Sequence, residues 1–288
     1  MFVGHKRNFS MTAIAIWCNH EVPNNAALWV AADSRVSASN GSILIEDGAK
    51  IFGLPVVCRS PGDDGFFSRV YHEHTYGYCF AGSTLMGQNT LLSITPLFSN
   101  LISTNSYVPS LSDIAQHALA HFRRSFDEYK QRMGQNAIFE AAVFGYCHKE
   151  QCLSAFHFSP KIGSDGIVHV ELIPHKSMKD KQFIYLGDEK KVMRARIEEA
   201  FSRETVPGRA VTRIPRYVIQ DSIDDDTFGS IGGDIQLAIA DRFGFRPFTL
   251  CKPRVPGQPE AYMSHLGREL TPDIAQVGEA MVGMNGMV

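Results

Sequence analysis

The residue that most directly suggests chemistry is Thr12, which follows Met11. A threonine at the very start of a chain carries a hydroxyl nucleophile and a free α-amine on one residue. The amine titrates near about 8, so a useful fraction of it is a free base at neutral pH. It can take the hydroxyl proton directly or through one water, and no histidine is needed. The alternative is that Thr12 is an ordinary residue at the start of a strand.

Two charged residues adjoin apolar segments, where burial without a partner is unfavourable. Asp33 follows the apolar run Ala26–Ala32, and Lys50 precedes Ile51. If strand pairing brings them together, they form a partly buried ion pair beside the start of the first strand. A lysine held there lowers the pKa of a nearby hydroxyl or amine. The alternative is a solvated charge cluster at a strand end.

A glycine, Gly82, stands where a strand passes into a helix, in the segment Phe80-Ala81-Gly82-Ser83. A backbone N–H at such a junction can point into a site and stabilise an oxyanion. Glycine is also common there as a plain turn residue, so this position alone is a weak signal.

The elements that must position these residues follow from the hydrophobic pattern. The apolar runs of strand length include Thr12–Cys18, Ala26–Ala32 and Tyr76–Ala81. Apolar residues three and four apart predict an amphipathic helix over Ser112–Met133, with Ser112 as its cap. We expect a second helix over Leu85–Ile102, kinked or interrupted at Pro96. The segment Pro215–Asp221 is ambiguous, and Glu189–Phe201 is expected to be helical.

The order of these elements predicts an α+β fold, because hairpin-connected strands alternate with blocks of helices. We expect a four-layer αββα sandwich, in which two antiparallel sheets are flanked by helices. No linker or internal repeat divides the 288 residues. Helices on the outer faces would also explain why several strands are apolar on both sides.

Composition excludes several classes of protein. Lys+Arg 28 against Asp+Glu 30 gives a formal net charge of −2, so no broadly basic face for nucleic acid is expected. No apolar run reaches the length of about 18 residues that a membrane helix requires. The 6 cysteines are scattered, which favours reduced thiols in a cytoplasmic protein. We expect neither a nucleic acid nor a membrane partner, and no metal or organic cofactor.

Four segments together resemble the pattern of proteasome β-subunits: Thr12–Ile16, Val30–Arg35, Lys50-Ile51 and Ala81–Ser83. By this resemblance the chain is similar to the N-terminal-nucleophile (Ntn) hydrolases, and within them to the bacterial proteasome-related subunits. It implies a leader or misassigned start over residues 1–11, an Ntn-hydrolase domain over 12–251 and a Pro/Gly-rich extension over 252–288. The four-layer sandwich is the fold that it implies.

The resemblance also assigns roles residue by residue. Thr12 would be the nucleophile, with its amine as the general base. Asp33 would orient Lys50, Lys50 would tune the threonine, and Gly82 would supply the oxyanion N–H. The sequence departs from the family in one segment, where an Asp-x-x-Ser-Gly-Gly motif is usual. Aligned on the glycines, Phe228 and Ile231 occupy those two places, and Asp226 and Ser230 lie nearby as possible substitutes.

These observations predict a threonine-type N-terminal hydrolase that cleaves amide bonds in peptides or proteins and assembles into a ring or other homo-oligomer. An ATPase partner is left open. Catalysis requires Thr12 to be exposed, either by translation from Met11 with removal of the methionine or by loss of a leader. Two alternatives stay open: a catalytically silent proteasome-like scaffold subunit, and an Ntn amidase that acts on a small molecule.

Overall fold

The computed structural model describes residues 12–38, 40–164, 166–203, 208–226, 228–254 and 259–287. The expected leader, residues 1–11, lies outside these ranges. Within the described residues, no helix is both long enough and apolar enough to cross a membrane.

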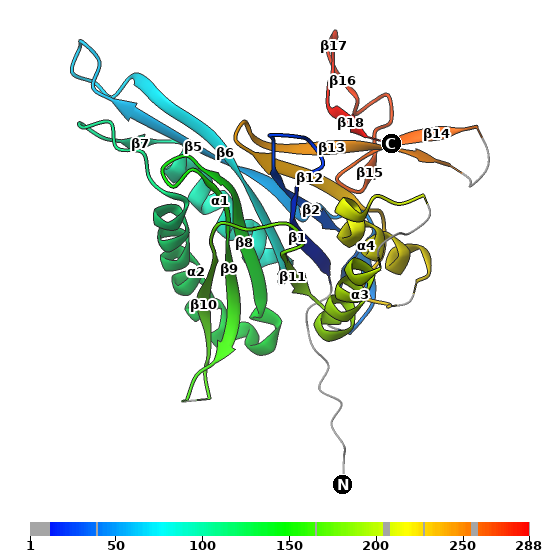
Figure 1. Cartoon of the computed structure of the whole chain (residues 1–288). Helices are drawn as coiled ribbons and strands as arrows, with labels where there is room; N and C mark the ends of the chain where they lie inside the picture. The colour runs from blue at the N-terminus through cyan, green and yellow to red at the C-terminus, as the bar shows by residue number, and fades with distance from the viewer. Residues whose placement is uncertain are drawn as a thin grey trace.

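The larger sheet has eight strands in the order β11-β1-β2-β12-β13-β14-β15, and β18 pairs with β13 in parallel (Figure 1). These strands are β1 (Ala13–Asn19), β2 (Ala27–Ala32), β11 (Phe183–Gly187), β12 (Gln236–Asp241), β13 (Gly244–Pro253), β14 (Ala261–His265), β15 (Arg268–Glu269) and β18 (Asn285–Met287). Every residue of β1 and β2 is buried, because both strands lie in the middle of the sheet and are covered on both faces.

The smaller sheet has six strands in the order β10-β9-β8-β6-β5-β7. They are β5 (Ile51–Ser60), β6 (Arg69–Gly82), β7 (Leu101–Ile102), β8 (Phe139–Cys147), β9 (Cys152–Ile162) and β10 (Val168–His175). Two further hairpins pair β3 (Val36–Ser37) with β4 (Ile43–Ile45) and β16 (Gln276–Val277) with β17 (Ala280–Met281). Strand β6 ends at Gly82, the glycine that the sequence analysis predicts to supply an oxyanion N–H.

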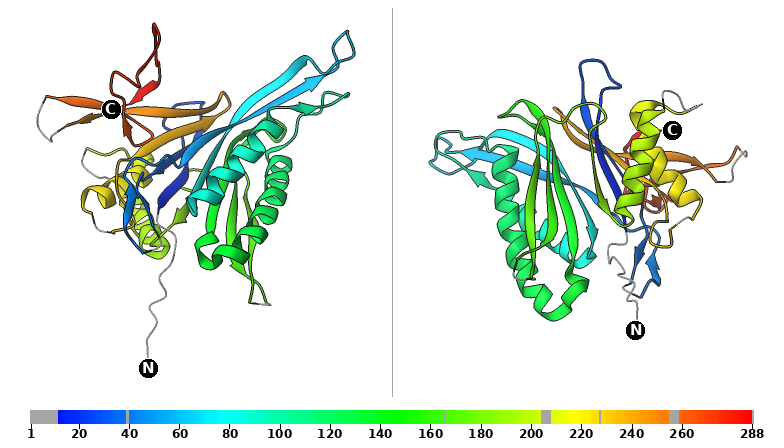
Figure 2. Two further views of the ribbon diagram at one scale, coloured as in Figure 1. Left: turned by 180° about the vertical axis from the view of Figure 1, so that it is seen from behind. Right: turned by 60° about the horizontal axis from the view of Figure 1, so that its bottom comes forward.

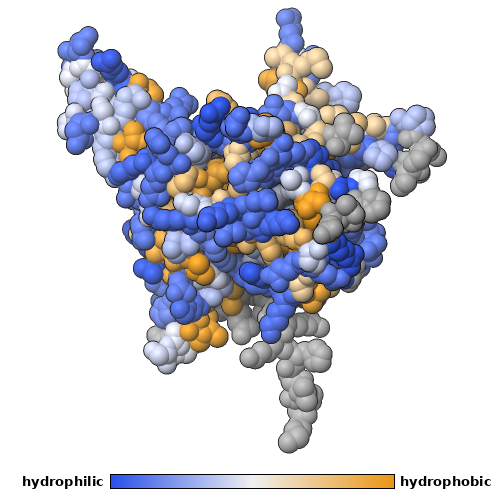
Figure 3. Space-filling model, viewed as in Figure 1, coloured by the Kyte–Doolittle hydropathy of each residue, from blue (hydrophilic) through white to orange (hydrophobic). Residues whose placement is uncertain are grey.

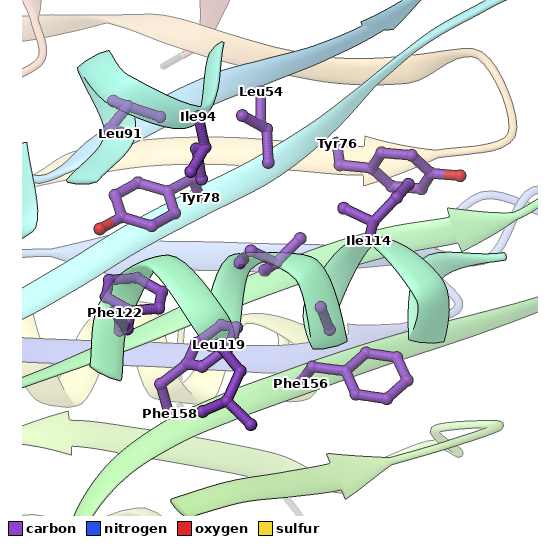
Figure 4. Close-up of a cluster of buried hydrophobic side chains, with 14 of the residues drawn as sticks. Leu54, Tyr76, Tyr78, Leu91, Ile94, Ile114, Leu119, Phe122, Phe156 and Phe158 are labelled. Atoms are coloured by element: carbon purple, nitrogen blue, oxygen red, sulfur yellow. The ribbon is translucent and has the colours of Figure 1, made fainter. Parts of the chain in front are cut away.

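Two helix pairs cover the sheets. Helices α1 (Thr84–Phe98) and α2 (Leu111–Met133) pack on the smaller sheet, and Figure 4 shows Ile94 and Phe122 meeting Tyr78 of β6. Helices α3 (Lys190–Ser202) and α4 (Ile214–Asp224) pack on the larger sheet around Trp17. A third apolar cluster lies between the sheets, where residues of β1 and β2 meet those of β6 and β8. Two short 3-10 helices complete the described elements, η1 (Gly134–Ala137) and η2 (Val211–Arg213).

The predicted four-layer αββα sandwich is wrong as a description of this chain. Strands make up 41% of it and helices only 25%, and the strands form several sheets, one of them a half-barrel. The physical reason is the length of the strands beyond the helices. Strand β6 has 14 residues, and together with β5 it projects past α1, while β14 and β15 extend the larger sheet away from α3 and α4 (Figure 2).

The helix ends show how local chemistry sets the boundaries. Ser110 caps α2, because its hydroxyl accepts a hydrogen bond from the Asp113 N–H at 3.1 Å and the Asp113 carboxylate accepts one from the Ser110 N–H at 2.9 Å. The prediction that Ser112 is the cap is therefore wrong. Helix α1 includes Pro96 and ends two residues later, at Phe98.

Candidate active site

Thr12 lies directly before β1, where it is buried and held by its backbone. Its carbonyl oxygen accepts a hydrogen bond from the Asp188 N–H at 2.7 Å. The next residue, Ala13, pairs with Gly187 in the register of β1 and β11. Gly187 has a φ of +109°, and a Cβ added there would overlap the Thr12 carbonyl. Only glycine permits this approach, so β11 fixes the backbone position of Thr12.

The structure brings Asp33 and Lys50 together beside Thr12. The Lys50 Nζ atom donates to Asp33 Oδ1 at 2.7 Å, and the Ala13 N–H donates to the same oxygen at 2.9 Å. One carboxylate oxygen therefore joins the ammonium group to the first peptide of β1. Lys50 also donates to the Arg35 carbonyl at 2.7 Å.

The pair is sealed from water and fixed by residues far along the chain. The exposed fraction is 3% for the Lys50 side chain and 0% for Asp33. The second Asp33 oxygen accepts from the Gly232 N–H at 3.2 Å. Gln236 accepts a hydrogen bond from the Lys50 N–H at 3.0 Å and donates one to the Gly48 carbonyl at 2.7 Å. These contacts hold the loop that carries Lys50 against the end of β2.

Burial governs the protonation of this pair. It raises the pKa of the Asp33 carboxyl above its usual range, and the Lys50 charge opposes that shift. It lowers the pKa of the Lys50 ammonium, and the Asp33 charge opposes that shift in turn. The result is a lysine that holds its proton less firmly than a surface lysine does and is oriented by one carboxylate.

Gly82 stands at the end of β6, opposite Phe139 of β8. Its φ is +92°, and a Cβ added there would lie 2.7 Å from the Ile138 carbonyl oxygen. The chain turns at this point into Ser83, the N-cap residue of α1. The glycine is therefore required by the turn itself.

Sequence reasoning did not single out Asp188, which follows Gly187 and lies beside Thr12. Its carboxylate accepts a hydrogen bond from the Ser230 hydroxyl at 2.7 Å, so Ser230 approaches the site through Asp188. Asp226 lies elsewhere and contacts the Arg35 guanidinium at 3.2 Å. The sequence did offer a signal for Asp188, because an acid directly follows Gly187 at the end of an apolar strand.

The described residues contain no group of three or more His, Cys, Asp or Glu side chains arranged to hold a metal ion. The groups at this site are instead a hydroxyl, a carboxylate–ammonium pair and backbone amides. In general, such a set can activate a hydroxyl nucleophile and stabilise the negative charge of a tetrahedral intermediate.

Comparison with known proteins yields a likeness in fold. No protein-family model matches the chain, and no curated protein matches its sequence. The chain is similar to the structure titled "Helical Assembly of the Anbu Complex from Pseudomonas aeruginosa", with a TM-score of 0.53 and 15% identity over 88% of this chain and 86% of that one. It is also similar to Anbu (ancestral beta-subunit) from Yersinia bercovieri, with a TM-score of 0.50 and 15% identity over 80% and 82% of the two chains.

These findings correct the family assignment drawn from the sequence. Four short matching segments identified the chain as similar to the proteasome β-subunit Ntn hydrolases, yet no family model matches and the identities are low. The assignment is therefore wrong as a sequence-based identification. What stands is a likeness in fold to Anbu proteins, one of which is described as an ancestral beta-subunit.

Proposed function

We propose that this chain is a threonine-type hydrolase of amide bonds in peptides, with Thr12 as the first residue of the mature protein. The observation that carries the proposal is the shared oxygen of Asp33, which binds both the Lys50 ammonium and the Ala13 N–H. A buried ion pair is difficult to justify by stability alone, because desolvating both charges offsets their attraction. Placed beside a threonine at a strand start, it has a chemical use.

In the proposed mechanism the Thr12 Oγ attacks the substrate carbonyl carbon, and the α-amine of Thr12 takes the hydroxyl proton. The backbone N–H of Gly82 donates to the oxyanion that forms. The protonated amine then gives its proton to the leaving amine as the amide bond breaks, which leaves an ester on Thr12. Water hydrolyses the ester, releases a carboxylic acid and restores the hydroxyl. Lys50, oriented by Asp33, favours the deprotonated states of the threonine hydroxyl and amine.

The experiment compares chains whose first residue is Thr12 on a set of fluorogenic peptides. Thr12→Ala is expected to lower kcat/KM by about 10³-fold or more while the melting temperature is kept. Thr104→Ala, an exposed threonine far from the site, is the matched control and is expected to retain full activity. Turnover by Thr12→Ala at the rate of the unchanged chain would falsify the mechanism. Intact mass and N-terminal sequencing of the native protein establish whether Thr12 is its first residue.

A second candidate function is a catalytically silent subunit whose role is assembly. The fold likeness supports this reading more directly than it supports catalysis, because one similar structure is described as a helical assembly. The chain also exposes apolar side chains on its surface, among them Leu92 on α1 at 72% and Leu44 on β4 at 62%. A native protein that keeps residues before Thr12, forms large oligomers and cleaves no peptide would favour this function.

A further inference from the structure

A cleft of about 700 Å³ lies where the two sheets reach their margins. Strand β10 is the last strand of the smaller sheet, and β11 is the last strand of the larger one. Residues of both strands line the cleft, together with the first turns of α3. Figure 1 shows where these three elements lie in the fold. Each of these edge strands has one side that no other described strand occupies.

The charged side chains of this cleft are all cationic. They are Lys176, Lys181, Lys190 and Arg194, and no Asp or Glu among the described residues lines it. Lys181 has no ion pair within the described part of the chain. Arg194 has only an exposed partner, Glu198, at 3.7 Å, and such pairs contribute little. Lys176 pairs with Glu150 at 2.8 Å and Lys190 with Glu140 at 2.7 Å. The positive charge that no described acid closely neutralises therefore comes from Lys181 and Arg194.

A buried polar network behind the wall of the cleft fixes one of these cations. Glu140 is 8% exposed, and its carboxylate accepts from Lys190 Nζ at 2.7 Å and contacts His157 Nε2 at 3.0 Å. Burial raises the pKa of Glu140, but His157 and Lys190 outweigh this and bring it below its usual range. Beside it, the Nε2 atom of His175 is buried without a hydrogen-bond partner.

The cleft is joined to the proposed nucleophile along β11. Tyr185 is one of the residues that line the cleft. Its side chain is buried, and its hydroxyl donates to the Asp188 carbonyl at 2.8 Å. The Asp188 N–H in turn donates to the Thr12 carbonyl at 2.7 Å. Tyr185 lies two residues before Gly187, so an extended peptide that follows β11 reaches the cleft roughly 7 Å from the Thr12 end, at about 3.4 Å per residue.

We propose that this cleft binds the acidic side chains of an extended peptide, and that acidic peptides are the substrates of the Thr12 site. The hydrolysis part rests on the function proposed above, whereas the binding part does not. Charge complementarity selects a polyanionic occupant. The unoccupied strand edges favour a peptide over a small anion, because an extended chain adds to a sheet edge through its backbone.

The first experiment measures binding without catalysis. A fluorescein-labelled peptide of alternating Glu and Ala is titrated with the full chain, beside the same peptide with Gln in place of Glu. We expect the Glu peptide to bind at least about ten-fold more tightly at low salt, and the preference to fall at high salt. Lys181→Glu and Arg194→Glu are each expected to weaken binding of the Glu peptide by about ten-fold.

The matched control is Lys191→Glu, which makes the same charge change at an exposed position of α3 that does not line the cleft. It is expected to change the affinity by less than about two-fold. Equal binding of the two peptides, or an equal loss in Lys191→Glu, overturns the proposal. Melting temperatures confirm that each variant is folded.

The second experiment separates this proposal from the proposed function. With Thr12 exposed, Lys181→Glu is expected to raise KM for an acidic fluorogenic peptide and to leave kcat unchanged. If the acidic peptide binds in a Lys181-dependent way but is not cleaved, the proposal of a peptide-binding cleft is supported and the proposed hydrolase function is contradicted. If acidic and neutral peptides are cleaved with equal KM, and Lys181→Glu does not change it, the proposed hydrolase function is supported. The proposal that the cleft binds acidic peptides is then contradicted.

Discussion

The two ends of strand β6 bury titratable groups in opposite ways. Near its last residue, Gly82, the strand contacts Lys50, because the Phe80 N–H donates to the Lys50 carbonyl at 3.3 Å. There Lys50 and Asp33 compensate each other's charge. Near its start, His72 and His74 face His148 from the β8–β9 turn, with ring centroids 5.3 Å and 4.4 Å away. No described acid accepts a hydrogen bond from any of these three rings.

The consequences for charge differ accordingly. Burial lowers the pKa of His72 and His148, and burial together with the neighbouring rings lowers the pKa of His74 to about 4. The Nε2 atoms of His72 and His74 are buried without partners. The Gly82 end of β6 thus retains buried charge, because an acid and a base lie together there. The histidine end excludes charge, because three imidazole rings lie together without an acid. Only the first is suited to stabilising charge in a reaction. Figure 3 shows one face of the molecule, which is mostly hydrophilic with scattered hydrophobic patches.

The largest effect is expected from breaking the compensated pair. Lys50→Ala leaves the Asp33 carboxylate buried without its counter-charge, so the free energy of unfolding should fall by about 3–5 kcal/mol in urea titrations. Lys161→Ala removes a lysine that is 63% exposed and paired with Glu171, and should cost about 0–1 kcal/mol. The double variant Asp33→Asn/Lys50→Met should be more stable than the single variant Lys50→Met, because it leaves no unpaired charge buried. Equal losses in Lys50→Ala and Lys161→Ala would contradict the comparison.

A smaller effect is expected from the backbone at the same end of β6. Gly82→Ala should lower the free energy of unfolding by about 2–3 kcal/mol, because the new Cβ meets the Ile138 carbonyl at a positive φ. Gly41 has a similar φ of +87° but nothing within 4 Å, so Gly41→Ala isolates the cost of the backbone angle at about 1 kcal/mol. If Gly82→Ala and Gly41→Ala lose equal amounts of unfolding free energy, the close approach of the new Cβ to the Ile138 carbonyl does not contribute to stability.

The smallest effect is expected at the histidine end, and it depends on pH. The pKa of His74 is about 4 in the folded state against 6.5 for a free histidine, so the unfolded chain binds more protons between these values. The free energy of unfolding should therefore fall as the pH drops from about 6.5 to about 4, by about 2 kcal/mol for this group. His74→Phe should flatten that slope in urea titrations at several pH values. Thr104→Ala, which changes an exposed residue without a titratable ring, should leave the slope as it is.

Much of the local structure could be predicted from the residues. The spacing of apolar residues placed α2 within one residue of its observed start, and the polar residues after β2 predicted a partner for Asp33. The ambiguous segment at Pro215 becomes α4, because its apolar residues pack under the larger sheet among Trp17 and Ile197. That packing depends on tertiary contacts which no local pattern contains.

The rest depended on contacts between distant segments. Asp188 reaches Thr12 only through the register of β11 with β1, and neither strand specifies that register alone. The layered fold was mispredicted for a related reason. Apolar runs indicated the buried parts of β5 and β6, but their exposed continuations, including Arg69 and Val70, carry no strong strand signal.

The contacts that enclose the Thr12 end also determine when it is completed during synthesis. Gly232 reaches back across 199 residues to Asp33, and Gln236 across 188 residues to Gly48. Contacts so distant in sequence form late in folding, because a long loop must close before they contribute any energy. A ribosome that has made only the first two thirds of the chain has made Thr12, Asp33, Lys50 and Gly82, but not the segment that locks them. The nascent polypeptide therefore carries the residues of the candidate site before it carries the segment that joins them.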